Sequence, residues 1–545
     1  MLTLEAVPPN SHLLLTSTAQ HHCQKMAVNV GKVPELIGNI AQHCSSTTRT
    51  KLLLCCRRFF PLVALPLWRN IKGAEKILLL IEGVTSQSVG GSRSVNIILP
   101  ALISKANFER FKLYAPFVRH LEIFKDKETD YVMFNASGLL DYSLSTPLLP
   151  NLQSLTISSP MWLLNDQRPL LPLLLIFISP SLTKYHVLYD VKRPSAVVSQ
   201  PRFTAILSTL QQRCSRLHAL SLYCSSDLYK HEDELSLMPL GYAVSAYFNS
   251  TNLHTLSTSL SVLEQMSTLQ PISHVEQLEI LGRGDIQDID VLSNFQDIEW
   301  PKLRHVALYL ISGIDTFFCL WQIPSLVAGL TSLRLHIGGY RSHHLEDLTD
   351  RVAITLAEKS PKLTCLSFNR SPPPNHKQAL DPAPLFGMLY KVQVHTLQMD
   401  IGDSLGLAPL QMEKYLTEQT FNAIQSLDAG AYRAQLEEFQ FFAQSMPYLN
   451  YLRIQISIGT VDNERARTGF NMGSEQPLKL CICYVKLGRV EPTLAWNYAS
   501  RYLLSQWSNL KLLLDRTVEP AHARWMGIFK GLQIQQNAHT DGCTQ

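Results

Sequence analysis

The sequence contains no apolar run long enough to cross a membrane. Its longest run, LLPLLLIFI at residues 170–178, is interrupted by Pro172, whereas a spanning helix needs about 20 apolar residues. Residues 1–25 lack the basic start of a secretory signal, and the apolar stretch Leu13–Leu15 is too short to be its core. These absences predict a soluble intracellular protein without a membrane partner.

Catalytic motifs are absent as well. The sequence has no Gly-x-x-x-x-Gly-Lys-Ser/Thr phosphate loop, no Gly-x-Ser-x-Gly turn and no His-Glu-x-x-His pair. His343 and His344 are adjacent and therefore point to different sides of a helix or strand. The aspartates of residues 284–290 lack the alternate spacing and closing Glu of a calcium loop. We therefore expect no enzyme activity, no cofactor and no metal site.

Charge and cysteine content also limit the function. Lys and Arg number 48 against 44 Asp and Glu, and this balance does not imply a nucleic-acid partner. The 11 cysteines are odd in number and show no zinc-ligand spacing, which favours free thiols in a reducing compartment. The 545 residues suffice for about three or four ordinary domains or for one solenoid.

The most distinctive segment is residues 33–71, VPELIGNIAQHCSSTTRTKLLLCCRRFFPLVALPLWRNI. Pro34 suits the first turn of a helix, where a missing N–H costs nothing. The polar residues 45–47 are expected to end that helix and to cap a second one. A helical unit this small buries too little apolar surface to be very stable alone, so we expect its apolar residues to bind a partner.

Three motifs follow one another in this segment: Pro34–Leu36, Cys56–Phe59 and Leu67–Trp68. Their order resembles an F-box, the helical module that joins a substrate receptor to a cullin–RING ubiquitin ligase. The resemblance implies that the segment binds a Skp-type adaptor, and the alternative is a plain helical hairpin that caps the next domain. The residues expected to bind the adaptor are Pro34, Glu35, Leu36, Ile37, Ile40, Leu52, Leu53, Cys56, Phe59, Leu67 and Trp68.

A weak repeat of the form Leu-x-x-Leu-x-Leu follows. Ten copies, spaced by 22 to 36 residues, begin at Val118, Leu152, Leu182, Leu217, Leu253, Val275, Leu303, Leu330, Leu363 and Val394. Further copies begin near Leu449 and Leu510, and the gaps of 55 and 61 residues leave room for a hidden copy in each, with residues 478–485 filling the second. Each step accommodates a short strand and an outer helix, as at 202–214 and 345–359. This spacing predicts a leucine-rich-repeat solenoid, with an ordinary α/β domain as the alternative.

These patterns predict an α/β chain in which a helical N-terminal module precedes an irregular solenoid of short parallel strands with outer helices. Helical stretches are expected at 74–82 and 101–114, on either side of a Gly/Ser-rich loop at 83–95. The expected divisions are a disordered segment at 1–30, the F-box-like module at 31–72, a helical linker region at 73–115 and the solenoid at 116–545, whose repeat pattern is weakest over 430–545.

The third and fifth positions of each repeat are expected to point away from the core, because side chains alternate along a strand. Solenoids commonly bind partners on such a surface. The alternative is that these positions are simply solvated. Fourth positions such as Leu220 and Leu366 are expected inside, and fifth positions such as Ser221 and Ser367 in solvent. The expected substrate-binding residues are His120, Lys184, His186, His305, Arg334, Gln398 and Arg453, with Glu122, Gln277, Glu279 and Tyr451 also facing outward.

Phrases beyond the first module extend the resemblance. Residues 107–121 (NFERFKLYAPFVRHL), 177–182 (FISPSL) and 358–363 (EKSPKL) are similar to F-box proteins of mushroom-forming fungi, which carry a degenerate leucine-rich domain behind the F-box. The resemblance implies a substrate-recognition subunit of an SCF-type cullin–RING ligase, located in the cytoplasm, the nucleus or both. Its contribution would be to hold a substrate protein near a ubiquitin-loaded enzyme. The alternative is a leucine-rich-repeat scaffold that acts outside any ligase.

Overall fold

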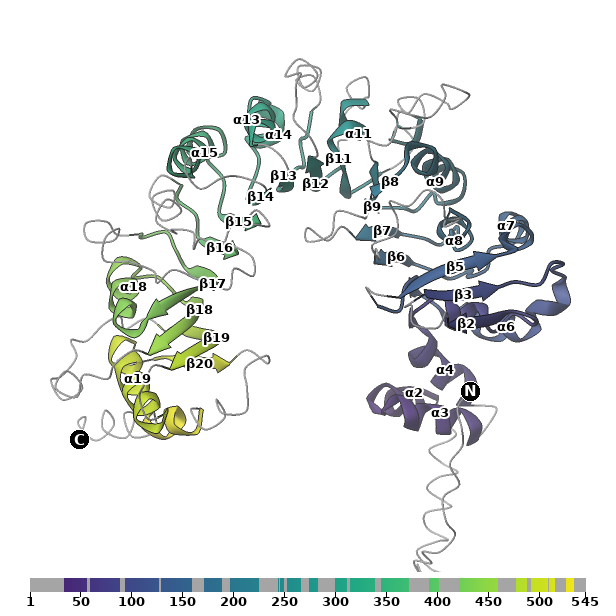
Figure 1. The fold of residues 1–545 in the computed structure, drawn as a ribbon, viewed down its shortest axis with the longest axis horizontal. Coiled ribbons are helices and arrows are strands. Elements are labelled where there is room, and N and C mark those ends of the chain that lie inside the picture. Colours follow the sequence, from purple (N-terminus) through teal and green to yellow (C-terminus); the bar gives the residue numbers. More distant parts are fainter. Residues whose placement is uncertain are drawn as a thin grey trace, which may run out of the picture. The chain divides into compact units, whose positions relative to one another are not determined.

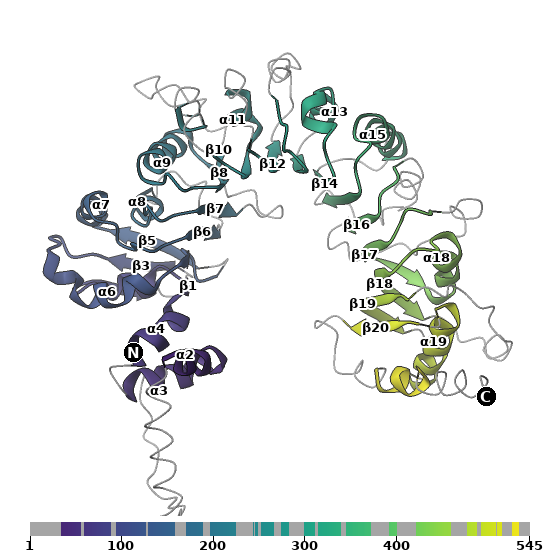
Figure 2. The same ribbon diagram turned by 180° about the vertical axis from the view of Figure 1, so that it is seen from behind.

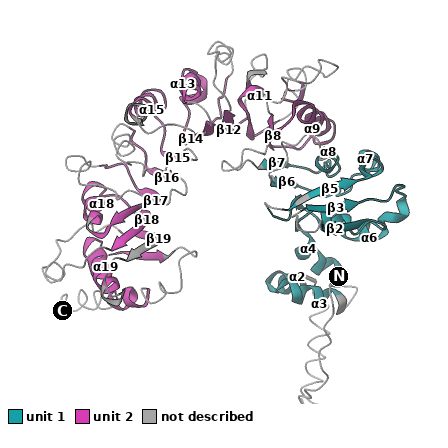
Figure 3. Ribbon diagram, viewed as in Figure 1, with its two compact units in different colours: residues 1–188 teal, residues 189–545 magenta. Residues whose placement is uncertain are grey.

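The computed structural model divides the chain into two compact units, Met1–Leu188 and Tyr189–Gln545 (Figure 3). The disorder expected for residues 1–30 lies outside the described residues. The structure describes residues 34–55, 59–88, 94–126, 129–158, 171–188, 197–224, 244, 246–248, 252–265, 274–282, 299–310, 314–338, 345–371, 392–400, 421–458, 477–487, 492–507, 509–514 and 526–533.

Unit 1 begins with three short helices, which we call the helical module: α2 (Pro34–His43), α3 (Ser46–Cys55) and α4 (Phe60–Trp68). Helix α2 starts at the proline, as predicted. The Ser45 hydroxyl accepts the backbone N–H of Thr48 at 3.2 Å, so this serine caps α3 as the sequence indicated. The module has a small core of its own, formed by Ile37, Ala41 and Val63 with the half-buried Leu52, Leu53, Phe59, Leu62 and Leu67.

Arg49 fastens the helices of this module to one another. Its guanidinium donates to the Ala41 carbonyl oxygen at 2.6 Å and to the Gln42 carbonyl oxygen at 2.7 Å, at the end of α2. A third, longer bond of 3.4 Å reaches the Pro66 carbonyl oxygen in α4. The last carbonyls of a helix have no partner within the helix, and a cation there also opposes the negative end of the helix dipole. Arg49 thus stabilises a module with a small apolar core.

The expectation of a helical linker at 73–115 is only partly correct. Helix α5 (Glu75–Leu78), the 3-10 helix η2 (Lys105–Phe108) and α6 (Glu109–Tyr114) do lie in this region. A small sheet lies there too, in which β2 (Thr85–Ser88) pairs antiparallel with β3 (Ser94–Ile98). Strand β3 in turn pairs parallel with β5 (Asp130–Phe134), which precedes α7 (Ala136–Ser145). Strand β2 and the start of β3 therefore lie where the sequence predicted a loop at 83–95, and the segment SVNII of β3 buries Ile97.

A second set of strands in unit 1 forms a parallel ladder: β1 (Asn70–Lys72), β4 (His120–Glu122), β6 (Ser154–Ser158) and β7 (Lys184–Leu188). Helix α8 (Leu171–Leu175) lies between the last two in sequence. The second residues of the four strands are in register and buried: Ile71, Leu121, Leu155 and Tyr185. Strand β1 is therefore a rung of the ladder that precedes the first copy recognised in the sequence.

Unit 2 continues the same pattern over a longer stretch. Each strand pairs parallel with the next one along the chain: β9 (Ala219–Ser221), β11 (Thr255–Ser259), β12 (Gln277–Gly282), β13 (His305–Leu310), β14 (Ser332–Gly338), β15 (Cys365–Ser371), β16 (Thr396–Asp400), β17 (Ser426–Gln435), β18 (Tyr451–Ile458), β19 (Lys479–Leu487) and β20 (Lys511–Leu514). Strands β17 and β19 are the two copies expected in the long gaps. The fourth repeat positions are mutual partners, as the period predicted: Leu220, Leu256, Leu278, Val306, Leu333, Leu366, Leu397, Leu427 and Leu452. The row continues with Leu480 on β19 and Leu512 on β20, so the copy that begins at Leu510 is one residue out of the expected phase and its fourth residue, Leu513, is 37% exposed.

Helices lie along one side of this second ladder (Figure 1 and Figure 2). They cover the buried fourth positions and leave the other sheet face open. The helix expected at 345–359 has those bounds, and the one expected at 202–214 begins two residues earlier. A short parallel pair, β8 (Val197–Val198) and β10 (Tyr223–Cys224), lies beside them. The helices are α9 (Gln200–Arg213), α11 (Leu260–Gln265), α13 (Asp315–Leu320), α14 (Pro324–Val327), α15 (Leu345–Lys359), α18 (Phe439–Ser445) and α19 (Pro492–Gln506).

A repeated backbone contact joins successive repeats where each strand begins. The Arg304 carbonyl oxygen accepts the N–H groups of Thr331 and Ser332 at 2.9 and 3.0 Å, and the Thr331 carbonyl oxygen accepts those of Thr364 and Cys365 at the same distances. The threonine hydroxyls add bonds of 3.2 and 3.1 Å to the same carbonyls. These contacts satisfy the backbone groups of the turn, in which no Asn recurs from repeat to repeat. The chain is thus α/β, with the strand stack and outer helices of a leucine-rich-repeat solenoid rather than the crossing strand order of a doubly wound domain.

Candidate functional site

The first candidate surface lies on helix α2. Ile37 and Ala41 face the core of the helical module, whereas Leu36 and Ile40 are 42% and 41% exposed. Both pairs are spaced i, i+4, so they occupy two different faces of the helix. The sequence grouped Leu36, Ile37 and Ile40 on one face, and the structure separates them. We call the exposed pair Leu36 and Ile40 the α2 apolar pair.

The other residues expected to bind the adaptor have varied surroundings. Glu35 is exposed, Pro34 opens α2, and Cys56 lies outside the described residues. Those that contribute to the core of the module are Ile37, Leu52, Leu53, Phe59 and Leu67. Ile37 is buried and the other four are half-buried, so Leu36 and Ile40 are the most exposed large apolar side chains among the expected adaptor-binding residues that the structure describes.

Trp68 packs within unit 1. Its ring lies 4.6 Å from that of Tyr114, measured between centroids, at an angle of 39°. Phe60 completes the cluster with edge contacts to Tyr114 at 5.5 Å and to Phe117 at 6.0 Å. Aromatic pairs at these separations add about 0.5–1.5 kcal/mol beyond area burial. Trp68 therefore joins α4 to the segment around α6, and its anchor is intramolecular.

The open sheet face of unit 1 carries three of the residues expected to bind substrate. Lys184 is exposed, and His120 and His186 are half-buried. Burial lowers the pKa of His120, and the nearby Arg69, Lys184 and Arg119 charges lower it further, so the surroundings favour the neutral imidazole. Glu122, the next outward-facing residue on β4, forms an ion pair with Lys72, with 3.0 Å between Lys72 Nζ and Glu122 Oε2.

The open sheet face of unit 2 brings together three more: His305, Arg334 and Gln398. They border a hollow of about 310 Å³ that crosses β11 to β16. We call this depression the β11–β16 hollow. Its size is at the lower end of the range for small-ligand pockets. Its other lining residues are Thr255, Leu256, Ser257, Gln277, Leu278, Glu279, Val306, Ala307, Ser332, Leu333, Cys365 and Ser367.

A buried carboxylate lies at one end of this hollow. The Tyr223 hydroxyl donates to Glu279, whose side chain is half-buried. Burial raises the pKa of Glu279, although the Tyr223 bond and the Arg334 charge act in the opposite direction. Burial and the Glu279 charge in turn raise the pKa of Tyr223 and of Tyr309. Tyr223 and Tyr309 occupy positions beyond the six-residue repeat, and the sequence offered no signal for them.

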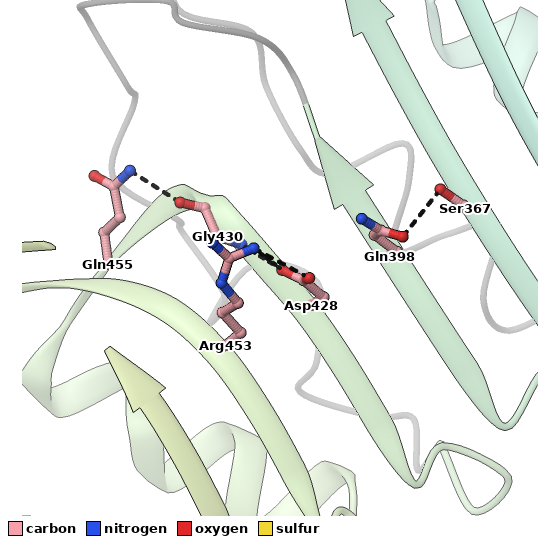
Figure 4. A network of polar contacts seen from close by, with 6 residues as sticks. All are labelled: Ser367, Gln398, Asp428, Gly430, Arg453 and Gln455. Carbon is pink, nitrogen blue, oxygen red and sulfur yellow. Dashed lines mark hydrogen bonds and ion pairs between the residues drawn. The ribbon is translucent and has the colours of Figure 1, made fainter. Parts of the chain in front are cut away.

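Further along the same face, Arg453 is engaged with a neighbouring strand (Figure 4). Its Nη1 lies 3.3 Å from Asp428 Oδ2 and 3.5 Å from Oδ1. The Gly430 N–H donates to Asp428 at 3.1 Å, and Gln455 donates to the Gly430 carbonyl oxygen at 2.9 Å. Asp428 follows the fourth position of the repeat on β17, a copy whose phase the sequence left undetermined. Arg453, expected to bind substrate, therefore has a partner inside the chain.

The expected exposure of Ser221 and Ser367 is wrong. Both occupy the open face, yet they are only 5% and 6% exposed. Ser367 lies between Arg334 and Gln398 in register, and its hydroxyl donates to Gln398 Oε1 at 3.4 Å. A small side chain between two long ones is covered by them, even on the outer face of a sheet. Leu220 and Leu366 are buried on the opposite face, as predicted.

No three His, Cys, Asp or Glu among the described residues lie where they could hold a metal ion. The cysteines whose state is described are free thiols. None of the described helices is long and apolar enough to cross a membrane.

Comparisons with known proteins add little to this geometry. No model of a known family matches the chain, and no curated protein is similar to it in sequence. Among solved structures, the leucine-rich-repeat-containing protein LegL7 from Legionella pneumophila is similar, with 11% identity and a TM-score of 0.33. The match covers 73% of this chain and 96% of that one. The solenoid assignment therefore depends on the strand register of this chain itself.

Proposed function

We propose that the chain is a substrate-recognition subunit of an SCF-type cullin–RING ubiquitin ligase. In this proposal the helical module is an F-box that binds a Skp-type adaptor, and the open sheet face of the solenoid binds a substrate protein. The order of motifs in residues 33–71 and the succession of a small helical module and a repeat solenoid support it. The chain would work in the cytoplasm, the nucleus or both, without an active site of its own.

The α2 apolar pair is the observation that carries this proposal. The module already has its own core, and yet Leu36 and Ile40 stay exposed on one helical face. Two large apolar side chains one turn apart are the anchors that a helix presents to a partner's groove. The adaptor is the partner that the F-box resemblance implies.

The test is co-purification of the full chain with a fungal Skp-type adaptor. The double variant Leu36→Asp, Ile40→Asp should abolish the complex, because each anchor is worth roughly 2–4 kcal/mol and the new carboxylates would be desolvated. Ile354→Asp is the matched control, since Ile354 is 46% exposed on α15 of unit 2. Far-UV circular dichroism should show that the double variant and the control variant are both folded.

A leucine-rich-repeat scaffold outside any ligase is the second candidate. The β11–β16 hollow supports it equally, because this hollow lies in unit 2 and the helical module lies in unit 1. If the wild-type chain fails to bind the adaptor, or if the double variant binds as well as the wild type, the receptor proposal is wrong and the scaffold is favoured.

A further inference from the structure

The β11–β16 hollow owes its shape to small residues in the fifth-position row. In register, that row reads Ser257 on β11, Glu279 on β12, Ala307 on β13, Arg334 on β14, Ser367 on β15 and Gln398 on β16. Ala307 and Ser367 flank Arg334 on both sides within this row, and the Tyr309 side chain on β13 forms a hydrogen bond with Arg334. The third-position row adds the small Ser332 and Cys365 beside it. Arg334 is accordingly exposed.

Arg334 differs from Arg453, although both occupy the fifth position. Arg453 pairs with Asp428 on the adjacent strand at 3.3 Å. Within the part of the chain that the structure describes, no carboxylate lies at ion-pairing distance from Arg334. The nearest acid, Glu279, is two strands away and accepts the Tyr223 hydroxyl. Of these two charged residues of the hollow, Arg334 is exposed, whereas Glu279 is half-buried and bonded to Tyr223.

The neutral groups around Arg334 offer mainly hydrogen-bond donors. The side-chain oxygen of Gln398 accepts from Ser367 at 3.4 Å, and that of Gln277 accepts from Thr255 at 3.4 Å. Their amide NH2 groups are left to donate, and His305 is exposed beside them. One guanidinium surrounded by neutral donors matches a single carboxylate. A phosphate dianion commonly requires a cluster of Arg residues, whereas the lining of the hollow contains a single Arg, Arg334.

We propose that the β11–β16 hollow binds an extended segment of a partner protein through an aspartate or glutamate side chain that pairs with Arg334. Neighbouring strands are about 4.8 Å apart, so the six strands span about 24 Å, which corresponds to about seven residues of extended chain. The segment would lie across the strands, since their backbone groups are already paired along the ladder. This inference names the substrate class of the proposed receptor and rests on that function.

The experiment starts with a phage-displayed library of random 12-residue peptides, selected on the full chain. The selected peptides should share an acidic residue. Fluorescence polarisation with the best synthetic peptide then compares its acidic residue with Gln, Lys and phosphoserine at the same position. We expect the Gln and Lys peptides to bind about 10- to 100-fold more weakly, as for the loss of one charge-assisted hydrogen bond, and phosphoserine to bind no better than the acid.

Protein variants connect this preference to the hollow. Arg334→Gln should reduce the affinity for the acidic peptide by about the same factor as the acid-to-Gln change in the peptide reduces its affinity for the wild-type chain. The two reductions should not add when both changes are combined, because both remove the same contact. Arg334→Glu should favour the Lys peptide. Arg351→Gln is the matched control: it removes the same charge from α15, where Arg351 lies 4.4 Å above the Phe318 ring, on the helical side of unit 2.

Several results would overturn the inference. These are a selection that yields no peptide or no shared acid, a phosphoserine peptide that binds more tightly, and an unchanged affinity for Arg334→Gln. Such a failure with adaptor binding intact would discard the hollow as the substrate site and leave the receptor proposal standing. Peptide binding without adaptor binding would instead keep the hollow and favour the scaffold.

Discussion

The contrast between Leu366 and Ser367 on β15 tests the register of the solenoid. Both residues are almost fully buried, but on opposite faces of the sheet. Leu366→Ala leaves a cavity under the helices and should lower the free energy of unfolding by about 2–5 kcal/mol. Ser367→Ala removes one hydrogen bond of 3.4 Å to Gln398 and should cost no more than about 1 kcal/mol. Burial alone would predict similar losses of stability for the two variants, so a difference between them shows which residue faces the core under the helices.

Carboxylates sharpen the same test. Leu366→Asp should unfold unit 2 or destabilise it by several kcal/mol, because the charge would have no partner in the core. Ser367→Asp should be tolerated much better, since its register neighbour Arg334 can pair with the new charge. Ser221→Asp should cost more than Ser367→Asp, because Ser221 contacts Tyr223, which holds the Glu279 carboxylate.

Urea denaturation followed by far-UV circular dichroism measures these losses. Equal losses for Leu366→Ala and Ser367→Ala would refute the register on β15. A Ser221→Asp variant as stable as Ser367→Asp would refute the electrostatic reasoning about the two serines, and leave the register intact.

Two further predictions concern Glu279 and Trp68. Burial raises the pKa of Glu279 in the folded state, so the folded chain binds the proton more tightly than the unfolded chain does. This carboxyl therefore stabilises the fold at low pH and loses that contribution as the pH rises through its folded pKa. The melting temperature of Glu279→Gln relative to wild type should increase with pH, and parallel pH profiles of the two proteins would contradict this. Trp68→Ala should lower the free energy of unfolding of unit 1 by about 2–4 kcal/mol, because the contact with Tyr114 is lost. The folded variant should keep its affinity for the adaptor. If a folded variant binds the adaptor tenfold more weakly, Trp68 contacts the adaptor.

Much of the solenoid could be predicted because its signal is local and periodic. A leucine occupies the fourth position on most of the strands, with Val306 on β13 and Tyr185 on β7 among the exceptions, and each copy needs only six residues to be recognised. The copies that escaped have weaker residues at those positions. On β17 the sixth position is Ala429, which is fully buried but too small to mark a core position in the sequence. On β1 the buried residue is Ile71, inside the segment that had been assigned to the helical module.

The site could be predicted only in part, because its contacts are lateral. Tyr223 and Glu279 are 56 positions apart and meet because consecutive strands lie side by side. The exposure of Ser367 depends on the length of its neighbours on β14 and β16, which no single repeat reveals. On α2, the sequence counted large apolar residues and overlooked Ala41, whose burial with Ile37 sets the inner face of the helix. Leu36 and Ile40 were then named as binding residues without the reason for their exposure.

The fifth-position row shows how one scaffold can carry different binding chemistry. The fourth positions hold the strands in register through the core, so the residues beside them face outward at fixed spacing whatever their type. Arg334 and Arg453 occupy equivalent places, but Asp428 neutralises one and the small Ala307 and Ser367 leave the other open. The identity of the neighbours in the row, rather than that of the arginine, decides which charge is available. A substitution of Ala307 by Asp should therefore close the hollow as a carboxylate site without disturbing the core.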